Sequence, residues 1–326
     1  MAGEFKAPSN VDVKLQESAQ KYRKDLLMMP ILGLGNSTKH MTLRPGVRGK
    51  ETVGELTGDM QFGPYSETRV GTNDVKVVAR VLETFLGSVV KPFSPNNVWS
   101  TVYGANITKG DALKNTPFTL QVLAYLCAKL GANLNKVLWT AVRNPDGKDS
   151  KDLFNGFGTI LKNEITATNI DVSKGNKFII EKITKQNAVD ILKSINEACS
   201  DELQGGKRKM FVPKAVYTAY CEDYKATTGA TPYNQEYKQT FVEGSEDLCE
   251  IVPLSNMKGS PHIVVTPQSN MLVGFGAGAD NETISVEKYH PFVLDFVATT
   301  WFGVEFETIS PEKLLVATTD NLAAIV

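Results

Sequence analysis

A glycine-rich loop near the C-terminus has the spacing of a dinucleotide-binding turn. Gly274, Gly276, Gly278 and Ala279 follow the apolar run 271–273 and match the pattern G-x-G-x-x-A. In such a turn, small residues let the backbone approach a pyrophosphate, which lies against the N-terminus of the next helix. Taken alone, this spacing predicts a nicotinamide or flavin enzyme.

The residues after the loop do not continue this pattern. The stretch 280–286 is poor in helix formers and alternates like a strand. Only 47 residues remain after Ala279, too few to complete a nucleotide-binding half. We therefore predict a glycine-rich connection between two strands and no cofactor. A nucleotide-binding enzyme that uses residues 274–279 remains the unfavoured alternative.

Two other loops carry residues that could bind a ligand. Asp146, Asp149 and Asp152 are close in sequence, but the loop lacks the alternating ligands and the closing Glu of a calcium loop. The stretch Gly33 to Thr38 lacks the Lys of a phosphate loop. We predict that both are turns.

Cysteine and histidine spacing gives no sign of a metal site or a disulfide framework. The cysteines are never in C-x-x-C spacing and the histidines are far apart: Cys127, Cys199, Cys221, Cys249, His40, His262 and His290. Isolated buried thiols are expected. Because no catalytic constellation stands out either, we predict that the chain is not an enzyme.

The composition is that of a soluble globular protein. The 326 residues are 42% hydrophobic and 22% charged, and the net charge of −1 argues against a dedicated nucleic-acid binder. Residues 1–50 nevertheless hold nine Lys or Arg and four Asp or Glu. No signal peptide or apolar run of ~18 residues is evident, so we expect a cytoplasmic product without a membrane span.

Two long strands and one long helix are predicted. Residues 292–306 alternate with period two, which would give a strand of roughly 50 Å. Residues 75–90 alternate similarly, and the two strands could pair antiparallel. Between them, Thr116 and Pro117 form a good helix start, and apolar residues recur at helical spacing to about Val142.

The region from about 166 to 284 reads as a separate α/β unit. We expect a helix from Thr184 that ends at Gly205 and Gly206. A strand over 207–213 then stops at Pro213, which opens another helix. Further short strands are predicted at 249–254 and 262–267.

Two N-terminal segments have no core of their own. Residues 45–71 contain six glycines and few apolar residues, so a hairpin there must lie on something else. In residues 1–40, a mostly polar helix-like run ends in four apolar residues from Leu26 to Met29. We predict that these four form an exposed interaction patch.

The order of these pieces resembles the major capsid proteins of tailed bacteriophages, whose fold is shared with encapsulin shell proteins. The resemblance runs from about residue 45 to 318. It rests on "FGPYSETRVGTNDVKVVARVLETFL", "PFTLQVLAYLCAKLGANLNKVLW", "GFGTIL", "KRKMFVPKAVYTAY" and "FVLDFVATTWFGVEFETISPEKLLVAT". These stretches resemble the end of the extended loop, the spine helix and its following turn, the axial-domain strand and helix, and the closing strand.

The resemblance implies an α+β fold with four parts. They are an N-terminal arm (1–44), an extended loop (45–74), a peripheral domain (75–165 and 285–308, with the spine helix at 117–142) and an axial domain (166–284 and 309–326). Copies would assemble through hexamers and pentamers into an icosahedral shell around phage DNA. The chain would be a virion component, assembled in the host cytoplasm. An encapsulin-like compartment shell is the alternative.

The implied partners are other copies of the chain, packaged DNA, and scaffolding, portal and decoration proteins, with no membrane. We expect inter-subunit contacts at the apolar residues of the arm and hairpin: Leu26, Leu27, Met28, Met29, Val53, Leu56, Met60 and Phe62. Sequence-independent DNA contacts are expected at the basic residues of the arm: Lys6, Lys14, Lys21, Arg23 and Lys24. No cofactor is implied.

Overall fold

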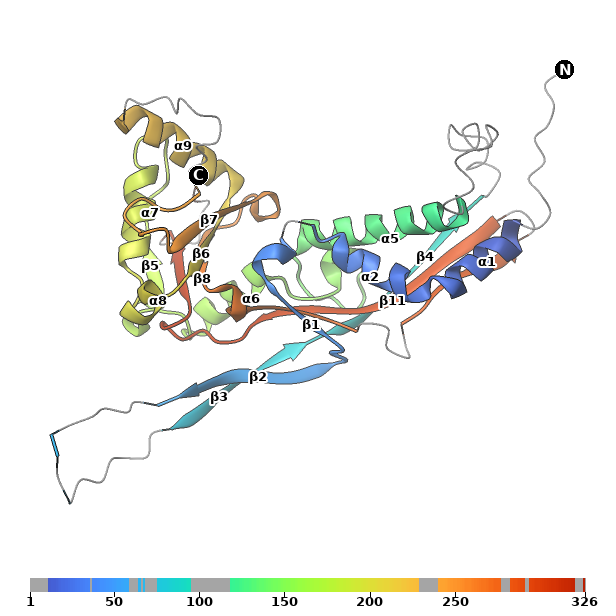
Figure 1. Ribbon diagram of the computed structural model, residues 1–326, viewed down its shortest axis with the longest axis horizontal. Coiled ribbons are helices and arrows are strands. Elements are labelled where there is room, and N and C mark those ends of the chain that lie inside the picture. The colour runs from blue at the N-terminus through green and yellow to red at the C-terminus, as the bar shows by residue number, and fades with distance from the viewer. Residues whose placement is uncertain are drawn as a thin grey trace.

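The computed structural model has an elongated body with an α/β unit at one end and a two-stranded hairpin that projects below it (Figure 1). It describes residues 11–35, 37–58, 64–65, 67, 75–94, 118–228, 240–276, 282–290, 293–319 and 325. Strands come in runs, over 42–93 and 249–318, and the α-helices lie before and between these runs, as expected for an α+β protein. Within these residues, short 3-10 helices lie at η1 (Thr38–His40), η3 (Ser150–Asp152), η4 (Val172–Lys174), η5 (Ser255–Met257) and η6 (Gln268–Asn270).

The first sheet is built around the 14-residue strand β11 (Val293–Phe306). Its strand order is β1-β9-β11-β10, and β4 also pairs with β11. The other strands are β1 (Thr42–Pro45), β4 (Phe85–Phe93), β9 (Met271–Phe275) and β10 (Ile284–His290). The period-two pattern is confirmed, because Leu294, Phe296, Ala298, Phe302, Val304 and Phe306 are all buried.

The strand predicted over 75–90 is two strands. Its first half, β3 (Lys76–Glu83), pairs antiparallel with β2 (Lys50–Thr57) and forms the hairpin. Its second half, β4, pairs antiparallel with β11, as expected for the two long strands. At the break, the hydroxyl of Thr84 donates to the Val47 carbonyl at 3.1 Å and accepts from the Gly49 amide at 3.0 Å. The paired strands of the hairpin therefore cover Lys50–Thr57 and Lys76–Glu83, which extends beyond the expected boundary at residue 74.

Three helices cover one face of the first sheet. They are α1 (Val11–Lys21), α2 (Arg23–Leu32) and α5 (Phe118–Val137). Their apolar side chains meet those of β10 and β11 in one cluster: Ala19, Leu26, Leu27, Leu123, Cys127, Ile284, Val286, Leu294, Phe296 and Ala298. The three helices and the sheet make a two-layered plate.

The long helix ends earlier than the predicted residue 142. After α5, the amides of Phe157 and Gly158 bind the carbonyls of Leu138 and Trp139 at 3.1 and 3.0 Å. The helix ends here because these two carbonyls, which would accept hydrogen bonds within a longer α5, accept instead from amides of α6 (Phe157–Thr166). The predicted start at Pro117 lies outside the described residues.

The second sheet has the order β5-β12-β8-β6-β7. Its strands are β5 (Lys177–Ile179), β6 (Arg208–Pro213), β7 (Cys249–Leu254), β8 (His262–Thr266) and β12 (Leu315–Thr318). Three helices accompany it: α7 (Ala188–Glu197), α8 (Asp201–Gly205) and α9 (Lys214–Thr228). The single helix predicted from Thr184 is thus two helices, because Ser200 caps α8 by accepting from the Leu203 amide at 3.3 Å.

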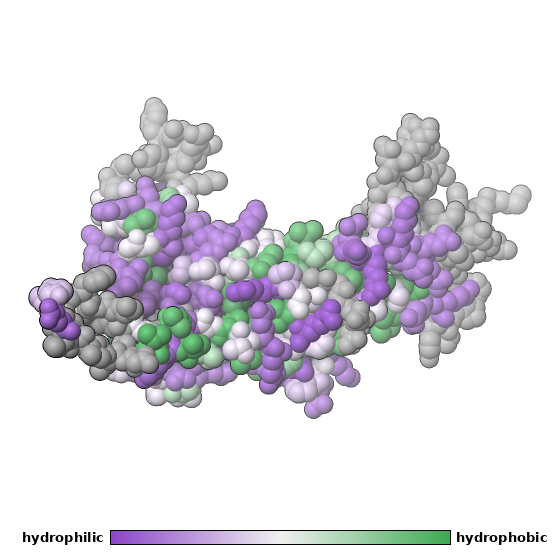
Figure 2. Space-filling model, turned by 60° about the horizontal axis from the view of Figure 1, so that its bottom comes forward, coloured by the Kyte–Doolittle hydropathy of each residue, from purple (hydrophilic) through white to green (hydrophobic). Residues whose placement is uncertain are grey.

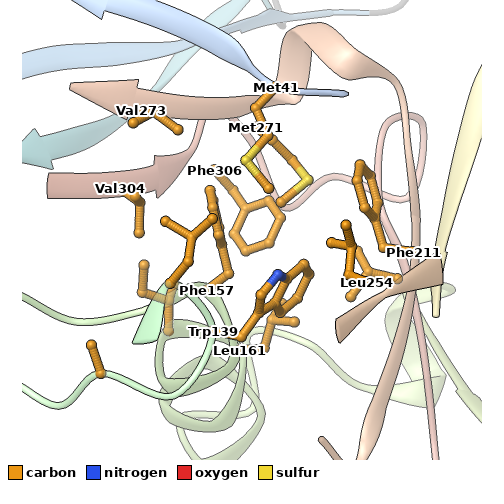
Figure 3. Packing of buried hydrophobic residues seen from close by; sticks show 14 of the residues in the cluster. Met41, Trp139, Phe157, Leu161, Phe211, Leu254, Met271, Val273, Val304 and Phe306 are labelled. Atoms are coloured by element: carbon orange, nitrogen blue, oxygen red, sulfur yellow. The ribbon is translucent and has the colours of Figure 1, made fainter. Parts of the chain in front are cut away.

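One continuous core joins the two sheets (Figure 3). The Trp139 ring lies 5.5 Å from the Phe157 ring and 6.2 Å from the Phe211 ring of the second sheet, between centroids. Phe157 in turn contacts Phe306 of β11 at 5.1 Å. The two sheets are therefore packed as one body.

The chain passes from the second sheet to the first directly after Asn270, whereas the axial domain was expected to continue to residue 284. The side chain of Asn270 donates to the Thr308 carbonyl at 3.0 Å and accepts from the Thr308 amide at 2.8 Å. Directly afterwards, β9 pairs with β1 and β11 of the first sheet. The backbone pairing of β9 thus assigns residues 271–275 to the first sheet.

Candidate functional site

The hairpin of β2 and β3 has two chemically different faces. Cross-strand pairing places Leu56 opposite Val77 on one face, with Ala79 and Val81 beside them. The other face alternates with it and carries Val53, Glu55, Arg80 and Leu82. Apart from the Lys50–Glu83 ion pair at its base, the first face is built from uncharged residues, whereas the second combines apolar and charged side chains.

The second face is packed onto the body of the same subunit. Val53 and Leu82 are buried in a small cluster with Val47 and with Leu272 of β9. The glycine at 274 allows this close approach, because a Cβ there would lie 2.8 Å from a methyl group of Thr84. The base of the hairpin is therefore anchored to the first sheet by apolar contacts.

Ion pairs add to this anchor. The Arg80 guanidinium lies 2.8 Å from a carboxylate oxygen of Glu164 in α6 and 2.8 Å from one of Glu305 in β11. Its Nε also donates to the Phe306 carbonyl at 3.2 Å. Further out, Lys313 approaches the buried Glu55 of β2 at 3.0 Å. These contacts fix the angle between hairpin and body.

The protonation behaviour of this cluster reflects its burial. Burial raises the pKa of Glu305, and the nearby Arg80 offsets this only in part. Burial alone would lower the pKa of Arg80, but the carboxylates of Glu305 and Glu164 raise it. Arg80 is thus held as a cation between two acids.

The first face of the hairpin is uncovered. We call its apolar residues the hairpin strip, which consists of Leu56, Val75, Val77, Ala79 and Val81. The side chains of Leu56 and Val77 are 71% and 69% exposed. Figure 2 shows hydrophobic surface at the far end of the hairpin strands. Clustered exposed apolar residues of this kind are typical of a protein–protein contact.

The predicted contact residues in the hairpin fall into three groups. Leu56 is exposed within the hairpin strip, whereas Val53 is buried against its own subunit. The expectation for Val53 as an accessible contact is therefore wrong, because alternation turns it toward Leu272. Met60 and Phe62 lie outside the described residues.

The predicted apolar patch of the arm is mostly internal. Leu26 and Leu27 are residues of α2 whose side chains are buried against the first sheet, and Met29 packs partly against the same cluster. The expectation of an exposed patch is wrong for these residues, because α2 lies on the sheet of its own chain. Met28 alone of the four is exposed.

The predicted DNA-facing residues are placed differently from one another. Lys21 and Lys24 are exposed, and the Lys21 ammonium lies 5.3 Å from the centroid of the Tyr22 ring. Arg23 instead donates a hydrogen bond to the backbone carbonyl of Glu282, so it ties α2 to the sheet. Lys14 lies in α1, and Lys6 lies outside the described residues.

The glycine-rich loop connects two strands, as predicted. Among the described residues, β9 leads into the loop and the next element is the strand β10, not the helix that a dinucleotide-binding turn requires. The Glu282 carboxylate occupies the space where a Cβ of Gly276 would lie. That carboxylate accepts from the Thr300 hydroxyl at 2.9 Å and the Trp301 amide at 3.0 Å. Gly276 therefore makes room for a protein side chain. Gly278 and Ala279 lie outside the described residues.

The other candidate ligand groups have structural roles. Asp149 and Asp152 form a reciprocal cap around η3. Burial raises the pKa of the Cys127 and Cys199 thiols to about 12 and that of Cys249 to about 11. Within the described residues, no group of three or more His, Cys, Asp or Glu could hold a metal ion. Nor does any helix there have the length and apolarity to span a membrane.

Solved structures of capsids are similar to this chain. No family model matches the chain, and no curated protein matches it in sequence. A satellite phage P4 procapsid structure matches with a TM-score of 0.55 at 11% identity, covering 92% of this chain and 98% of that one. The capsid of an empty GTA particle matches with a TM-score of 0.56 at 10% identity, covering 88% and 90%.

An encapsulin structure also matches. The SrpI encapsulin complex from Synechococcus elongatus has a TM-score of 0.50 at 9% identity and covers 89% of this chain and 88% of that one. At such low identity the similarities establish the fold alone. The chain has the α+β fold shared by tailed-phage capsid proteins and encapsulin shells, which confirms the predicted fold.

Proposed function

We propose that this chain is a phage major capsid protein, which assembles through hexamers and pentamers into an icosahedral shell around DNA. The fold supports this role, and the hairpin strip is the observation that carries it. One hairpin face is fixed to its own subunit by Arg80, while the other offers uncharged apolar residues to a neighbour. The chain then has a structural and not a catalytic role.

Assembly through the hairpin strip is head-to-tail. Each copy presents its strip to a different surface of the next copy, and such contacts close into rings when the rotation permits. Full burial of a Leu or Val side chain contributes about 1.5–3 kcal/mol. Association costs an estimated ~4–15 kcal/mol in lost freedom of motion. One strip contact is therefore weak, and a closed ring in which every copy gives and receives a hairpin is favoured.

The parts of the subunit take the roles that the fold suggests. We assign the extended loop to Lys50–Glu83, the peripheral domain to the first sheet with α5, and the axial domain to the second sheet. The N-terminal arm comprises the residues before β1. Assembly takes place in the host cytoplasm, with scaffolding, portal and decoration proteins as further partners.

The hairpin strip gives the sharpest test of self-assembly. Replacing Leu56 and Val77 together by Asp places charges on the strip without disturbing a buried residue. We expect a folded subunit with unchanged circular dichroism that no longer forms shells in light scattering and negative-stain micrographs. The matched control is Val172→Asp, since Val172 of η4 is also exposed, at 52%, and lies outside the strip. Normal shells from the double variant would refute the role of the hairpin.

The encapsulin similarity supports a second candidate, a shell that houses a protein cargo. Both candidates use the same subunit contacts, so the contents of the shell must separate them. Shells purified from the natural source and treated with nuclease would retain long DNA if the chain is a capsid protein. Shells that retain a single co-purified protein and no DNA would instead favour the compartment.

A further inference from the structure

Residues 37–41 join the arm helix α2 to strand β1 and lie against the second sheet. We call them the junction segment, which includes η1. The Met41 side chain is buried in the core that the two sheets share. Directly after it, β1 pairs with β9 of the first sheet. The junction segment therefore connects the N-terminal helices to both sheets.

The first end of the junction segment is held by groups that carry no charge. The Ser37 hydroxyl donates to the side-chain oxygen of Asn135 at 2.8 Å and accepts from the side-chain amide of Asn256 at 3.2 Å. The Asn256 amide also donates to the backbone carbonyl of Asn135 at 2.8 Å. Ser37 and Asn256 are buried. Because hydroxyl and amide groups do not titrate in the ordinary pH range, this end stays bound when the pH changes.

The other end of the segment places a histidine beside two charged residues of the second sheet. Lys209 of β6 and Glu250 of β7 are direct cross-strand partners, and their charged groups lie 3.3 Å apart. The Lys209 ammonium also lies 3.0 Å from Nδ1 of His40, and that nitrogen lies 3.9 Å from a Glu250 carboxylate oxygen. The His40 ring meets the Phe211 ring edge-on, with 6.5 Å between centroids. We call His40, Lys209 and Glu250 the junction triad.

The geometry of the junction triad requires a neutral imidazole. A lysine ammonium has only donors, so it binds Nδ1 of His40 where that nitrogen keeps its lone pair and the ring proton is on Nε2. A second proton, on Nδ1, would instead place two cationic groups 3.0 Å apart. The side chains of His40 and Lys209 are only 21% and 17% exposed, so water screens this repulsion less than it would at the surface.

The surroundings of His40 lower its pKa below the ordinary value of 6.5. Burial is the main cause, the Lys209 and Lys39 cations add to it, and the Glu250 carboxylate opposes it. Among the described residues, these are the charged groups that face the ring from β6, β7 and η1. Just below pH 6.5, the unfolded chain therefore binds a proton that the folded chain does not. The contribution of His40 to stability is complete above this pH and is lost as the pH falls through the lowered pKa.

We propose that the junction triad is an acid-sensitive latch. At neutral pH, Lys209 binds His40 and holds the junction segment on the second sheet. In acid, Nδ1 of His40 takes up a proton, the hydrogen bond from Lys209 breaks, and this end of the segment opens while Ser37 stays bound. The apolar contact of Trp139 with Phe211 does not titrate, so the two sheets stay packed. The latch belongs to the single subunit and does not depend on the proposed capsid function.

The first test follows the protonation of His40 in the full-length chain. Magic-angle spinning NMR of protein with isotope-labelled histidine is recorded from about pH 8 to about pH 4, and His40 is identified by its missing signal in His40→Gln. We expect an unprotonated Nδ1 at neutral pH and a titration midpoint below 6.5. Lys209→Met should raise this midpoint, because it removes a cation, and Glu250→Gln should lower it.

The control for this titration is Lys225→Met, which removes an exposed lysine of α9 and should leave the midpoint unchanged. A wild-type midpoint at or above 6.5 would overturn the proposal. Equal shifts in Lys209→Met and Lys225→Met would overturn it as well, because the Lys209 contact would then have no specific effect on His40.

The second test measures whether the junction segment opens. Hydrogen exchange of a peptide covering residues 37–45 is compared between wild type and His40→Gln at equal pH, which cancels the chemical effect of pH on exchange. Gln can accept from Lys209 but does not titrate, and the other histidines are present in both proteins. From about pH 8 to about pH 5, the ratio of the wild-type rate to the variant rate should rise, by up to about tenfold for each unit by which the pKa is lowered.

A peptide covering α7, on the far side of the second sheet core, provides the internal reference for this exchange. Its ratio should stay constant over the same pH range. A constant ratio for the junction peptide, or an equal rise in both peptides, would overturn the latch, because the first outcome shows no opening and the second shows unfolding of the whole subunit.

Discussion

At the residue scale, Arg80 connects the hairpin to the body. It reaches from β3 to Glu164 of α6 and Glu305 of β11, both at 2.8 Å. Only 14% of its side chain is exposed, so these pairs are screened less than surface pairs. By contrast, Lys50 and Glu83 at the base of the uncovered face form an ion pair at 3.4 Å in which Lys50 is 70% exposed. The ion pairs of Arg80 are more buried than the Lys50–Glu83 pair, so we expect their loss to lower the free energy of unfolding more.

Replacing Arg80 by Ala should destabilise the subunit strongly. The change leaves two carboxylates in a mostly buried site, and breaking a buried pair typically costs about 3–5 kcal/mol. We expect a lower midpoint in urea and faster amide exchange in β2 and β3. Lys50→Ala, the control, should cost at most about 1 kcal/mol. Similar costs for both variants would mean that Arg80 does not anchor the hairpin.

His262 of β8 predicts a pH dependence of stability. Burial lowers its pKa to about 4, against an ordinary value of 6.5. Between these values the unfolded chain binds the proton and the folded chain does not, so stability falls as the pH falls. The loss attributable to His262 is on the order of 3 kcal/mol between pH 7 and 4. His262→Gln should flatten the free energy of unfolding over this range, and an unchanged pH profile would contradict the assignment.

At the element scale, the crossing of α2 and α5 depends on a glycine. The Cα of Gly131 faces the carbonyl of Pro30 so closely that no Cβ fits between the two helices. In an isolated helix, Gly to Ala would be stabilising by about 1 kcal/mol. Here the steric conflict with the backbone of α2 should outweigh that gain, because backbone atoms cannot rotate away. The helix pair thus depends on a residue that weakens α5 by itself.

Gly131→Ala is therefore expected to lower the thermal midpoint of the subunit. Gly205→Ala in α8 provides the control, since nothing lies within 4 Å of the Cβ it would add. That control should be neutral or stabilising. A rise in the midpoint for Gly131→Ala would show that α2 moves aside at little cost.

At the scale of the whole molecule, the two faces of the hairpin lie in different surroundings. Val53 and Leu82 are buried against Leu272 of the same subunit, whereas Leu56 and Val77 are exposed. Under the proposed capsid function, the exposed face is the one that meets a neighbouring copy.

Local patterns in the sequence were enough to predict most of the regular helices and strands. Period-two alternation predicted β11 to within one residue, and apolar runs predicted three strands of the second sheet, β6, β7 and β8. The short strand β5 was not predicted. Context alone showed that the loop at Gly274 and Gly276 joins two strands. The order of these elements was also enough to predict the fold, because each element's period depends only on residues nearby in the chain.

Only the tertiary structure decided which surfaces are free. Leu26 and Leu27 looked exposed from the sequence, yet α2 lies on its own sheet, and the continuous pattern over 75–90 breaks at Thr84. Arg80 shows which face of the hairpin is turned toward the body, because it binds Glu164 and Glu305, which lie 84 and 225 residues away in the chain. Burial and charge pairing depend on such distant neighbours, and no local pattern contains them.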